Sequence, residues 1–294
     1  MSLVLSSLSQ GLLWSIMAIG VYLTFRILDI ADLTAEGSYP LGAAICATCI
    51  VSGINPLLAT LLAMLGGCLA GIVSGLIHTK LKNPALLTGI ITLTGLYSIN
   101  LKVLGKANVA LLRQKTLVTQ LYDMGFTKLG AVLIIGAVFA LLVIVLLSLL
   151  MKTRLGLALR ATGDNIPMSQ ANGIETDHMK ILAYLLSNGL IALCGALLCQ
   201  NNGYADLNAG VGTIVIGLAS IIIAEVIIKN LSIGWRLASL VLGSILYRLI
   251  ILAILSIPGM DADLVKLFSA ILLASVLFIP ELQKKLKLDR VKLV

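Results

Sequence analysis

The residues of this chain most able to do chemistry are charged groups in or beside long apolar stretches. They are Asp32, Glu36, Glu225 and Arg248. A charge at the centre of a membrane helix costs about 2.5 to 3.5 kcal/mol on insertion scales, so each needs a partner or a role. Glu225 stands four residues before Lys229, which predicts an ion pair along one helix. We expect Arg248 to face another helix or a cavity, in a structural pair rather than against a bound solute.

Polar residues also interrupt the apolar pattern between positions 31 and 38. Asp32, Thr34, Glu36 and Ser38 are clustered there around Gly37. Unwound backbone and side-chain oxygens of this kind can line a path through a bilayer. An ordinary turn, with Glu36 near the start of the next helix, explains the same residues equally well. Both interpretations stay open at this point.

Further hydrogen-bonding groups stand inside apolar segments. Thr88, Thr92 and Thr94 fall between Pro84 and Leu101, and Asn188 lies in a later segment. These side chains could contact a solute, although Thr and Asn also cap and pack helices in membranes.

Several kinds of catalytic site are missing from the sequence. It contains no phosphate-binding loop of the G-x-x-x-x-G-K-[ST] type, no H-E-x-x-H and no G-x-S-x-G. Cys46 and Cys49 form a single C-x-x-C inside an apolar run, which favours packing over metal binding or redox chemistry. We therefore expect no catalytic residue, metal or cofactor, and no enzyme.

Composition indicates a polytopic membrane protein. Hydrophobic residues make up 59% of the chain and charged residues only 12%, against about 25% charged in soluble domains. Runs of the roughly 20 apolar residues that a spanning helix needs occur at eight places. They are 8–27, 37–54, 56–77, 129–151, 179–200, 209–228, 235–257 and 263–280. Pro84 to Leu101 is shorter and rich in Thr and Gly, which predicts a ninth, kinked or partly re-entrant segment.

The basic residues predict the orientation of these spans, because Lys and Arg near span ends stay on the cytoplasmic side. The basic tail, 281–294, is therefore expected to be cytoplasmic. Counting back places the loop 152–178 inside and residue 1 outside. Segment 102–128 is basic yet falls outside, and an interfacial helix from Val109 to Tyr122 could hold its cations near lipid headgroups. The net charge of +8 reflects this orientation and does not indicate nucleic-acid binding.

A short repeat suggests two related halves. Residues 31–35 read Ala-Asp-Leu-Thr-Ala, and residues 205–209 read Ala-Asp-Leu-Asn-Ala. The expected topology places the two copies at opposite ends of the bilayer. This predicts an inverted repeat, a plan common in transporters. The fold expected is an all-α membrane domain over residues 1–294, with eight or nine transmembrane helices.

The long polar loop is predicted to contain a short helix over Leu155 to Ala161. Gly163, Asp164 and Asn165 are helix-stop signals, and Pro167 allows a second start. Such a helix is too short to span, so it should lie along the cytoplasmic face, with Leu157, Leu159 and Ala161 as docking side chains. A solvated connector is the alternative.

This loop resembles the cytoplasmic coupling segment of permeases of the branched-chain amino acid and ribose type, which are membrane subunits of ABC importers. The residues that match are Gly156, Ala158, Leu159, Arg160, Ala161, Gly163, Asp164, Asn165, Gly173 and Ile174. Ser169 stands where the family pattern has alanine. The segment from Asp32 to Ser38 is similar to that family's D-L-S-x-G-S signature, with Thr34 for Ser and one extra residue before Gly37. The resemblance covers about residues 8 to 280.

The resemblance implies a set of partners and a substrate class. A second permease copy would complete a homo- or heterodimer, a separate ATP-binding subunit would receive the coupling segment, and an external binding protein or lipoprotein would deliver the solute. The chain looks closest to a branch associated with amino acid uptake, in some cases of aromatic amino acids. A stand-alone secondary transporter or channel is the alternative, in which Asp32 or Glu36 would pair with Arg248 for ion coupling.

Overall fold

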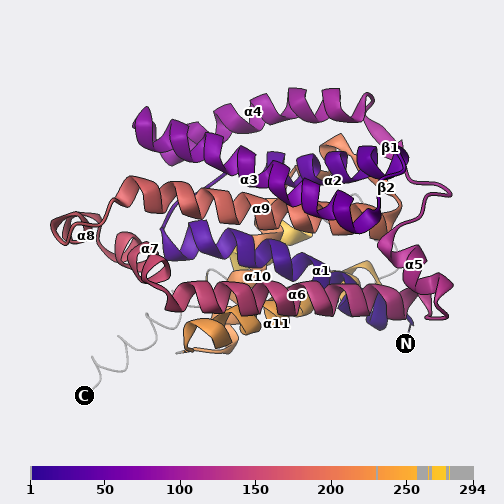
Figure 1. Cartoon of the computed structure of the whole chain (residues 1–294). Coiled ribbons are helices and arrows are strands. Elements are labelled where there is room, and N and C mark those ends of the chain that lie inside the picture. Colours follow the sequence, from indigo (N-terminus) through magenta and orange to yellow (C-terminus); the bar gives the residue numbers. More distant parts are fainter. Residues whose placement is uncertain (1, 230, 257–263, 265–266, 276–277, 279–294) are drawn as a thin grey trace, which may run out of the picture.

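The computed structural model describes residues 2–229, 231–256, 264, 267–275 and 278, and forms a bundle of long helices lying side by side (Figure 1). The long helices are α1 (Ser2–Tyr22), α2 (Ala35–Val51), α3 (Pro56–Lys80), α4 (Ala85–Leu104), α6 (Lys128–Lys152), α9 (Thr176–Asn202), α10 (Thr213–Ile227) and α11 (Ile233–Leu255). The shorter elements are the π-helical turn η1 (Leu23–Ile27), β1 (Asn108–Ala110), α5 (Leu117–Asp123), α7 (Arg154–Asp164), α8 (Ile166–Ala171), β2 (Tyr204–Asp206) and the 3-10 helix η2 (Leu207–Gly210).

Seven helices in the described residues are long and apolar enough to cross a membrane. They cover Leu3–Ile27, Pro56–Lys80, Ala85–Leu104, Lys128–Lys152, Thr176–Asn202, Leu207–Ile227 and Ile233–Leu255. Helix α2 has 17 residues, fewer than the roughly 20 that a complete span needs. The span predicted at 37–54 is therefore a shorter apolar helix than expected, and it is not one of these seven. The predicted span 263–280 lies partly outside the described residues, and the tail 281–294 lies entirely outside them.

The segment predicted to be kinked or re-entrant is a regular helix. All residues of α4 from Ala85 to Leu104 are α-helical. Its hydroxyls bond back to its own backbone: Thr92 Oγ1 donates to the Thr88 carbonyl at 2.9 Å, and Thr94 Oγ1 to the Ile90 carbonyl at 2.8 Å. Threonines satisfied in this way do not interrupt a membrane helix.

One end of the bundle carries two short strands, which the sequence did not predict. Helices α4 and α9 end at Gly105 and Gly203, which adopt φ of 71° and 79°, a left-handed conformation that suits glycine at a helix end. The chains leaving them pair as antiparallel strands, with Asn108 opposite Asp206. The interfacial helix expected over 109–122 is wrong over 109–116, because the only helix in this range, α5, begins at Leu117.

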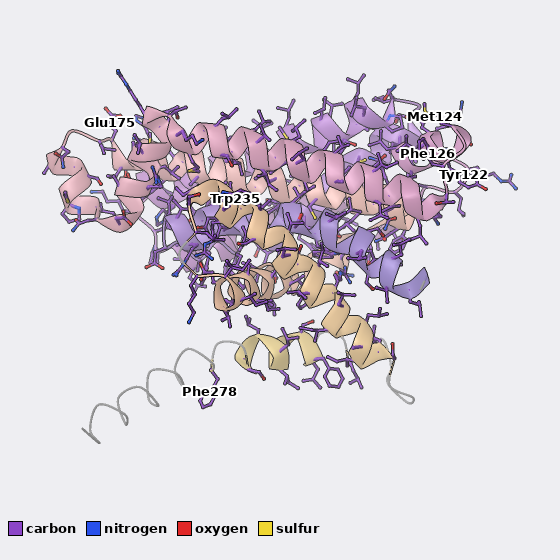
Figure 2. The ribbon with its side chains drawn as sticks, turned by 90° about the horizontal axis from the view of Figure 1, so that it is seen from below. Tyr122, Met124, Phe126, Glu175, Trp235 and Phe278 are labelled. Atoms are coloured by element: carbon purple, nitrogen blue, oxygen red, sulfur yellow. The ribbon has the colours of Figure 1, made fainter. Side chains whose placement is uncertain are left out.

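The bundle therefore has a strand end, with β1, β2 and α5, and a loop end, with α7 and α8 (Figure 1). Exposed Tyr122, Met124 and Phe126 mark the strand end, and Glu175 marks the opposite one (Figure 2). His78 near the end of α3 lines a pocket together with Asn165 of the loop. The turn from α3 to α4 thus lies at the loop end, in the alternation that the sequence predicted.

Helix α9 runs through the middle of the bundle and packs closely on α3. A Cβ added at Gly67, Gly71 or Gly75 would lie 2.4, 2.2 or 2.9 Å from the nearest atoms of α9. Glycines four residues apart bring two backbones together in this way. This contact holds α9, and with it Asn188, close to α3.

Candidate functional site: a helix that begins inside the bundle

The polar break predicted from the sequence is present, and it lies inside the bundle. After η1 the chain leaves the helical conformation over residues 28–34 and turns back towards the centre. Asp32 Oδ1 accepts the backbone N–H of Thr34 at 2.9 Å, and α2 starts at Ala35. Gly37 in its first turn packs against Leu96 and Leu93, near the middle of α4. Helix α2 therefore begins at mid-bundle depth and runs to the strand end.

A closed set of hydrogen bonds holds the break against α9. Asn188 Nδ2 donates to Asp32 Oδ2 at 2.7 Å, and Asn188 Oδ1 accepts from Ser38 Oγ at 2.7 Å. Asp32 is 4% exposed, and Ser38 and Asn188 are fully buried. A buried carboxylate is tolerated when its oxygens receive hydrogen bonds. The amide of Asn188 thus satisfies two polar groups of the break with one side chain.

A second set of hydroxyls joins the break to α3 and α4. The Thr34 hydroxyl lies 2.9 Å from that of Ser74 and 2.7 Å from that of Thr92. All three residues are buried. Thr88 is also buried, and its hydroxyl has no hydrogen-bond partner among the described residues. Five of the seven predicted path residues, namely Asp32, Thr34, Ser38, Thr92 and Asn188, thus bond to one another, and Ser74 is a member that sequence reasoning missed.

Glu36 points elsewhere, towards the start of α10. Its Oε1 accepts the backbone N–H of Gly212 at 2.9 Å. A Cβ at Gly210 would lie only 1.9 Å from the Glu36 carbonyl oxygen, so no larger residue fits there without a shift. The first turn of α2 and the turn that begins α10 therefore touch.

The two similar pentapeptides share one local hydrogen bond. Asp206 Oδ1 accepts the N–H of Asn208 at 3.0 Å, just as Asp32 accepts that of Thr34 at 2.9 Å. Each such Asx turn precedes a helix. Helix α2 leaves towards the strand end and α10 towards the loop end, where Glu225 bonds Arg26. The two copies thus start helices that run in opposite directions.

Beside Glu36 there is a hollow of about 410 Å³ between α2, α4 and the η2 segment. Its lining residues are Glu36, Gly37, Pro40, Leu93, Thr94, Tyr97, Ser98, Asn100, Leu207, Asn208 and Val211. We call this the polar hollow. The sequence did not lead us to predict Asn100 or Asn208 as lining residues. The spacing of Thr94, Tyr97 and Ser98 places these side chains on one face of a helix, and this spacing is a signal from which the hollow could be predicted.

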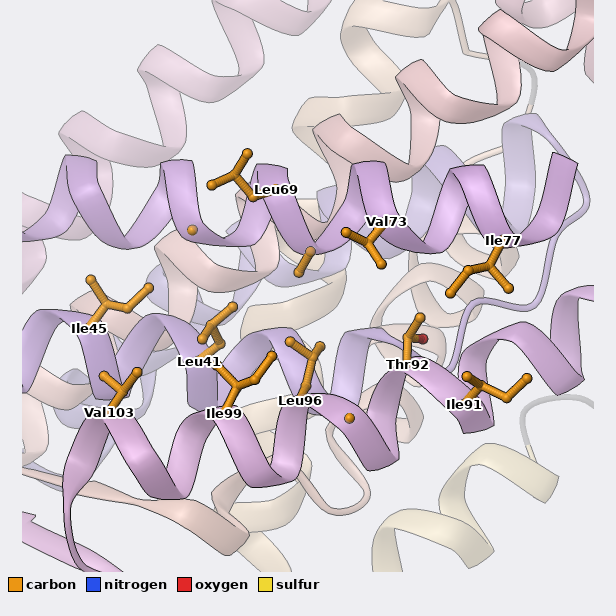
Figure 3. Close-up of a pocket in the computed structure, with 13 residues that line it drawn as sticks. Leu41, Ile45, Leu69, Val73, Ile77, Ile91, Thr92, Leu96, Ile99 and Val103 are labelled. Atoms are coloured by element: carbon orange, nitrogen blue, oxygen red, sulfur yellow. The ribbon is translucent and has the colours of Figure 1, made fainter. Parts of the chain in front are cut away.

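A different hollow lies on the other side of α4, towards α3 (Figure 3). It has about 460 Å³ and is lined almost entirely by aliphatic side chains, among them Leu69, Val73, Ile91, Leu96 and Ile99. Its polar member, Thr92, directs its hydroxyl to Thr34. We call this the apolar groove.

Of the remaining membrane charges, Glu225 has a partner other than the one predicted, and Arg248 faces another helix as expected. Glu225 Oε1 lies 2.8 Å from Arg26 Nε, so its observed contact joins two helices rather than following one. The Arg248 guanidinium lies 4.9 Å from the ring centre of Trp14, a cation–π contact. It therefore faces another helix, as expected. Among the described residues, neither Asp32 nor Glu36 forms the ion pair with Arg248 that was considered for ion coupling: Asp32 bonds Asn188, and Arg248 lies against Trp14.

The loop forms the predicted short helix, stop and restart. Helix α7 ends at Asp164, and Asn165 Oδ1 accepts the N–H of Met168 to cap α8. Gly173 has φ of 78° and ends that turn. Asp164, Asn165 and Gly173 are exposed, whereas Ala161 is half-buried.

The packing of α7 corrects one docking residue. Leu159 is fully buried, because a helix turns about 100° per residue and places Leu157 and Leu159 on different faces. The exposed large apolar residues of α7 and α8 are Leu155, Leu157, Ile166 and Met168, at 52%, 53%, 39% and 65%. Leu159 as a docking side chain is therefore wrong, and it packs inward.

Two glycines seat α7 on the bundle. A Cβ at Gly156 would lie 2.4 Å from the Leu150 carbonyl oxygen, and one at Gly163 would lie 1.7 Å from that of Ile27. Arg160 and Asp164 line a hollow of about 440 Å³ with Arg26. The part of the loop that resembles a coupling segment is thus fixed by glycines on its inner side and carries charge beside the end of α1.

Membrane-length helices around a helix that begins in mid-bundle define a multi-pass membrane transport protein. The family of branched-chain amino acid transport system permease components matches residues 3–277, and the chain belongs to this family. Its members are permease components of ABC-type systems, which do not catalyse a reaction themselves and work with ATPase and binding-protein partners.

Three curated relatives illustrate the range of the family. A tyrosine transport system permease protein of Clostridioides difficile (strain R20291) is 40% identical over 294 residues, which cover 100% of this chain and 97% of the relative. An uncharacterised protein of Rickettsia prowazekii (strain Madrid E) is 33% identical over 93% of this chain and 96% of its own. An autoinducer 2 import system permease of Photorhabdus luminescens is 29% identical over 76% and 65%. No solved structure matches the chain.

Proposed function

We propose that this chain is the permease of an ABC importer for an amino acid, and that tyrosine is the first substrate to test. The observation that carries the proposal is the 40% identity, over the whole chain, to a permease named for tyrosine transport. The buried break supports it, since a solute crossing a bilayer needs polar groups held at membrane depth. The separate partners of Asp32 and Arg248 give no support to an ion-coupled, stand-alone carrier.

The proposed orientation places the loop end in the cytoplasm of a bacterial-type cell. Basic residues of the loop and of the α3–α4 turn favour this side, and the C-terminus would lie there too. The strand end would then face an external binding protein or lipoprotein. In this arrangement the two Asx turns and their oppositely directed helices are the related parts of an inverted repeat.

The loop, residues 152–178, would couple to the ATP-binding subunit. Leu155, Leu157 and Met168 offer exposed apolar contacts, and Arg160, Asp164 and Asn165 add polar ones. Gly156, Leu159 and Gly163 would transmit movement, because they fix α7 to α6 and to the end of α1. Ala161 and Gly173 would shape the same surface.

The translocation path would run past the polar hollow. The face of α4 with Thr94, Tyr97 and Ser98 is exposed at mid-span, and polar groups at that depth are favoured next to protein or water rather than lipid. A second permease copy covering this face would enclose the path. Glu36 would then face the solute, while Asp32, Thr34, Ser38, Thr88, Thr92 and Asn188 would brace the break beside it.

The partner set can be tested by purifying the tagged chain in mild detergent from its own cells and identifying bound proteins by mass spectrometry. A soluble ATP-binding protein should be recovered, and the cells should lose tyrosine uptake when the chain is deleted. Recovery of the chain alone, with uptake that does not depend on ATP, would contradict the importer.

The coupling role can be tested with Arg160→Ala combined with Asp164→Ala. Recovery of the ATP-binding protein should fall by about 10-fold, as expected for loss of two charged contacts. Asp177→Ala removes an exposed carboxylate at the same end and serves as the control. Equal recovery and uptake in both variants would place the coupling contact elsewhere.

A further inference from the structure

We infer that the polar hollow is a binding site for a primary ammonium group, held by the Glu36 carboxylate and the Asn100 side-chain carbonyl. The inference rests on the proposed function, because it assigns the part of an amino acid that this chain recognises. The hollow, of about 410 Å³, falls within the range of small-molecule sites, roughly 300 to 1,000 Å³.

The first observation is an acceptor without a donor. Asn100 is 1% exposed, and its Nδ2 donates to the Gly37 carbonyl at 3.1 Å. That bond fixes the orientation of the amide, since only the nitrogen can donate. Asn100 Oδ1 has no hydrogen-bond partner among the described residues, and Asn100 lines the hollow. A buried carbonyl of this kind calls for an N–H donor from a ligand.

The second observation is the charge of the wall. Glu36 lines the hollow from α2 and contributes a carboxylate to it. A carboxylate inside a membrane bundle favours a cation beside it. An ammonium group with three N–H donors can serve the carboxylate and the Asn100 carbonyl together.

The rest of the wall suits the remainder of an amino acid. The Tyr97 and Ser98 hydroxyls and the Asn208 amide are groups able to donate to a carboxylate, and Leu93, Leu207 and Val211 add apolar surface. Both helix starts contribute, because Glu36 belongs to the first turn of α2 and Asn208 to η2, which precedes α10. The site therefore lies where the two helix starts meet.

The test uses the permease with its ATP-binding subunit in nanodiscs, without the external binding protein. Binding of radiolabelled L-tyrosine is measured directly, and tyramine and 3-(4-hydroxyphenyl)propionate compete with it. Tyramine lacks the carboxylate and the propionate lacks the ammonium group. The wild-type complex should bind the propionate at least about 10-fold more weakly than tyrosine, as expected when a charged hydrogen-bonding group is lost.

Glu36→Gln is the informative variant, because glutamine keeps an oxygen to accept the Gly212 N–H and removes the charge. This variant should weaken the binding of tyrosine and of tyramine by at least about 10-fold, and it should change the binding of the propionate by less than about 2-fold. Asn100→Ala should weaken the same two ligands by about 3- to 10-fold. Glu175→Gln makes the same change at an exposed position and should bind as wild type.

The possible outcomes test the ammonium site and the importer function separately. If Glu36→Gln assembles and binds tyrosine within about twofold of wild type, the ammonium site is wrong and the importer proposal is unaffected. If only Asn100→Ala assembles, the same result from that variant leads to the same conclusion. If the wild-type complex neither binds nor imports any amino acid, the proposed function fails and the site fails with it.

Discussion

The two sides of α4 differ in character although they belong to one helix. The side towards α3 opens into the apolar groove (Figure 3), and the side towards η2 opens into the polar hollow. Ile99 and Ser98 are neighbours in sequence, yet they line different hollows. Helix α4 thus separates an apolar surface from a more polar one, and an amphipathic pattern inside a membrane marks this division.

Both hollows depend on how α4 is fastened to α2. The Thr92–Thr34 contact borders the apolar groove, and the bond from Asn100 to Gly37 borders the polar one. Behind both lies the buried network centred on Asn188. Substitutions can therefore remove this shared network or change one hollow alone.

The largest effect is expected from Asn188→Ala, which removes the common support. The substitution leaves the Asp32 carboxylate and the Ser38 hydroxyl without their amide partner in the interior. The free energy of unfolding in detergent should fall by about 2 to 4 kcal/mol, measured by denaturant titration. Asn202→Ala, at an exposed position of the same helix, should change it by less than about 0.5 kcal/mol. Equal stability of the two variants would mean that the network does not hold the break.

Ser98→Trp and Gly95→Trp place the same bulky side chain in different hollows beside α4, because Ser98 lines the polar hollow and Gly95 lines the apolar groove. Ser98→Trp fills the polar hollow and should reduce tyrosine uptake by at least about 10-fold, because the space for a ligand is lost. A Cβ at Gly95 meets nothing within 4 Å, so Gly95→Trp enters the apolar groove and should leave uptake within about twofold. The reverse ranking in a radiolabelled uptake assay would assign the path to the groove.

The smallest effect separates two adjacent residues by their contact with water. Ser98→Cys should react with a membrane-impermeant thiol reagent about 5-fold faster than Ile99→Cys, because the reactive thiolate forms only where water reaches it. Labelling of the unsubstituted chain, whose five cysteines are free, gives the background. Similar rates at the two positions would show that α4 does not separate a wet side from a dry one.

Local patterns were enough to predict several features of the loop and the break. The stop at Asn165 and the restart at Pro167 follow from helix-end preferences, and both are observed. The polar break before α2 follows from the loss of apolar residues around Asp32. The sequence failed for Leu159, whose side chain points inward, because a single short helix does not reveal which of its faces meets the bundle.

Sequence alone predicts the membrane class, the alternation of the helices between two ends, and the positions of the polar break and of the loop 152–178. These depend on composition and periodicity over about 20 residues, which a bilayer or a helix end imposes locally. The tertiary structure decided that Asp32 bonds Asn188, 156 positions away, and that Glu36 meets Gly212 beside Asn100. Those contacts depend on which helix faces pack together, and the energy that selects them arises between distant segments, where no local pattern records it.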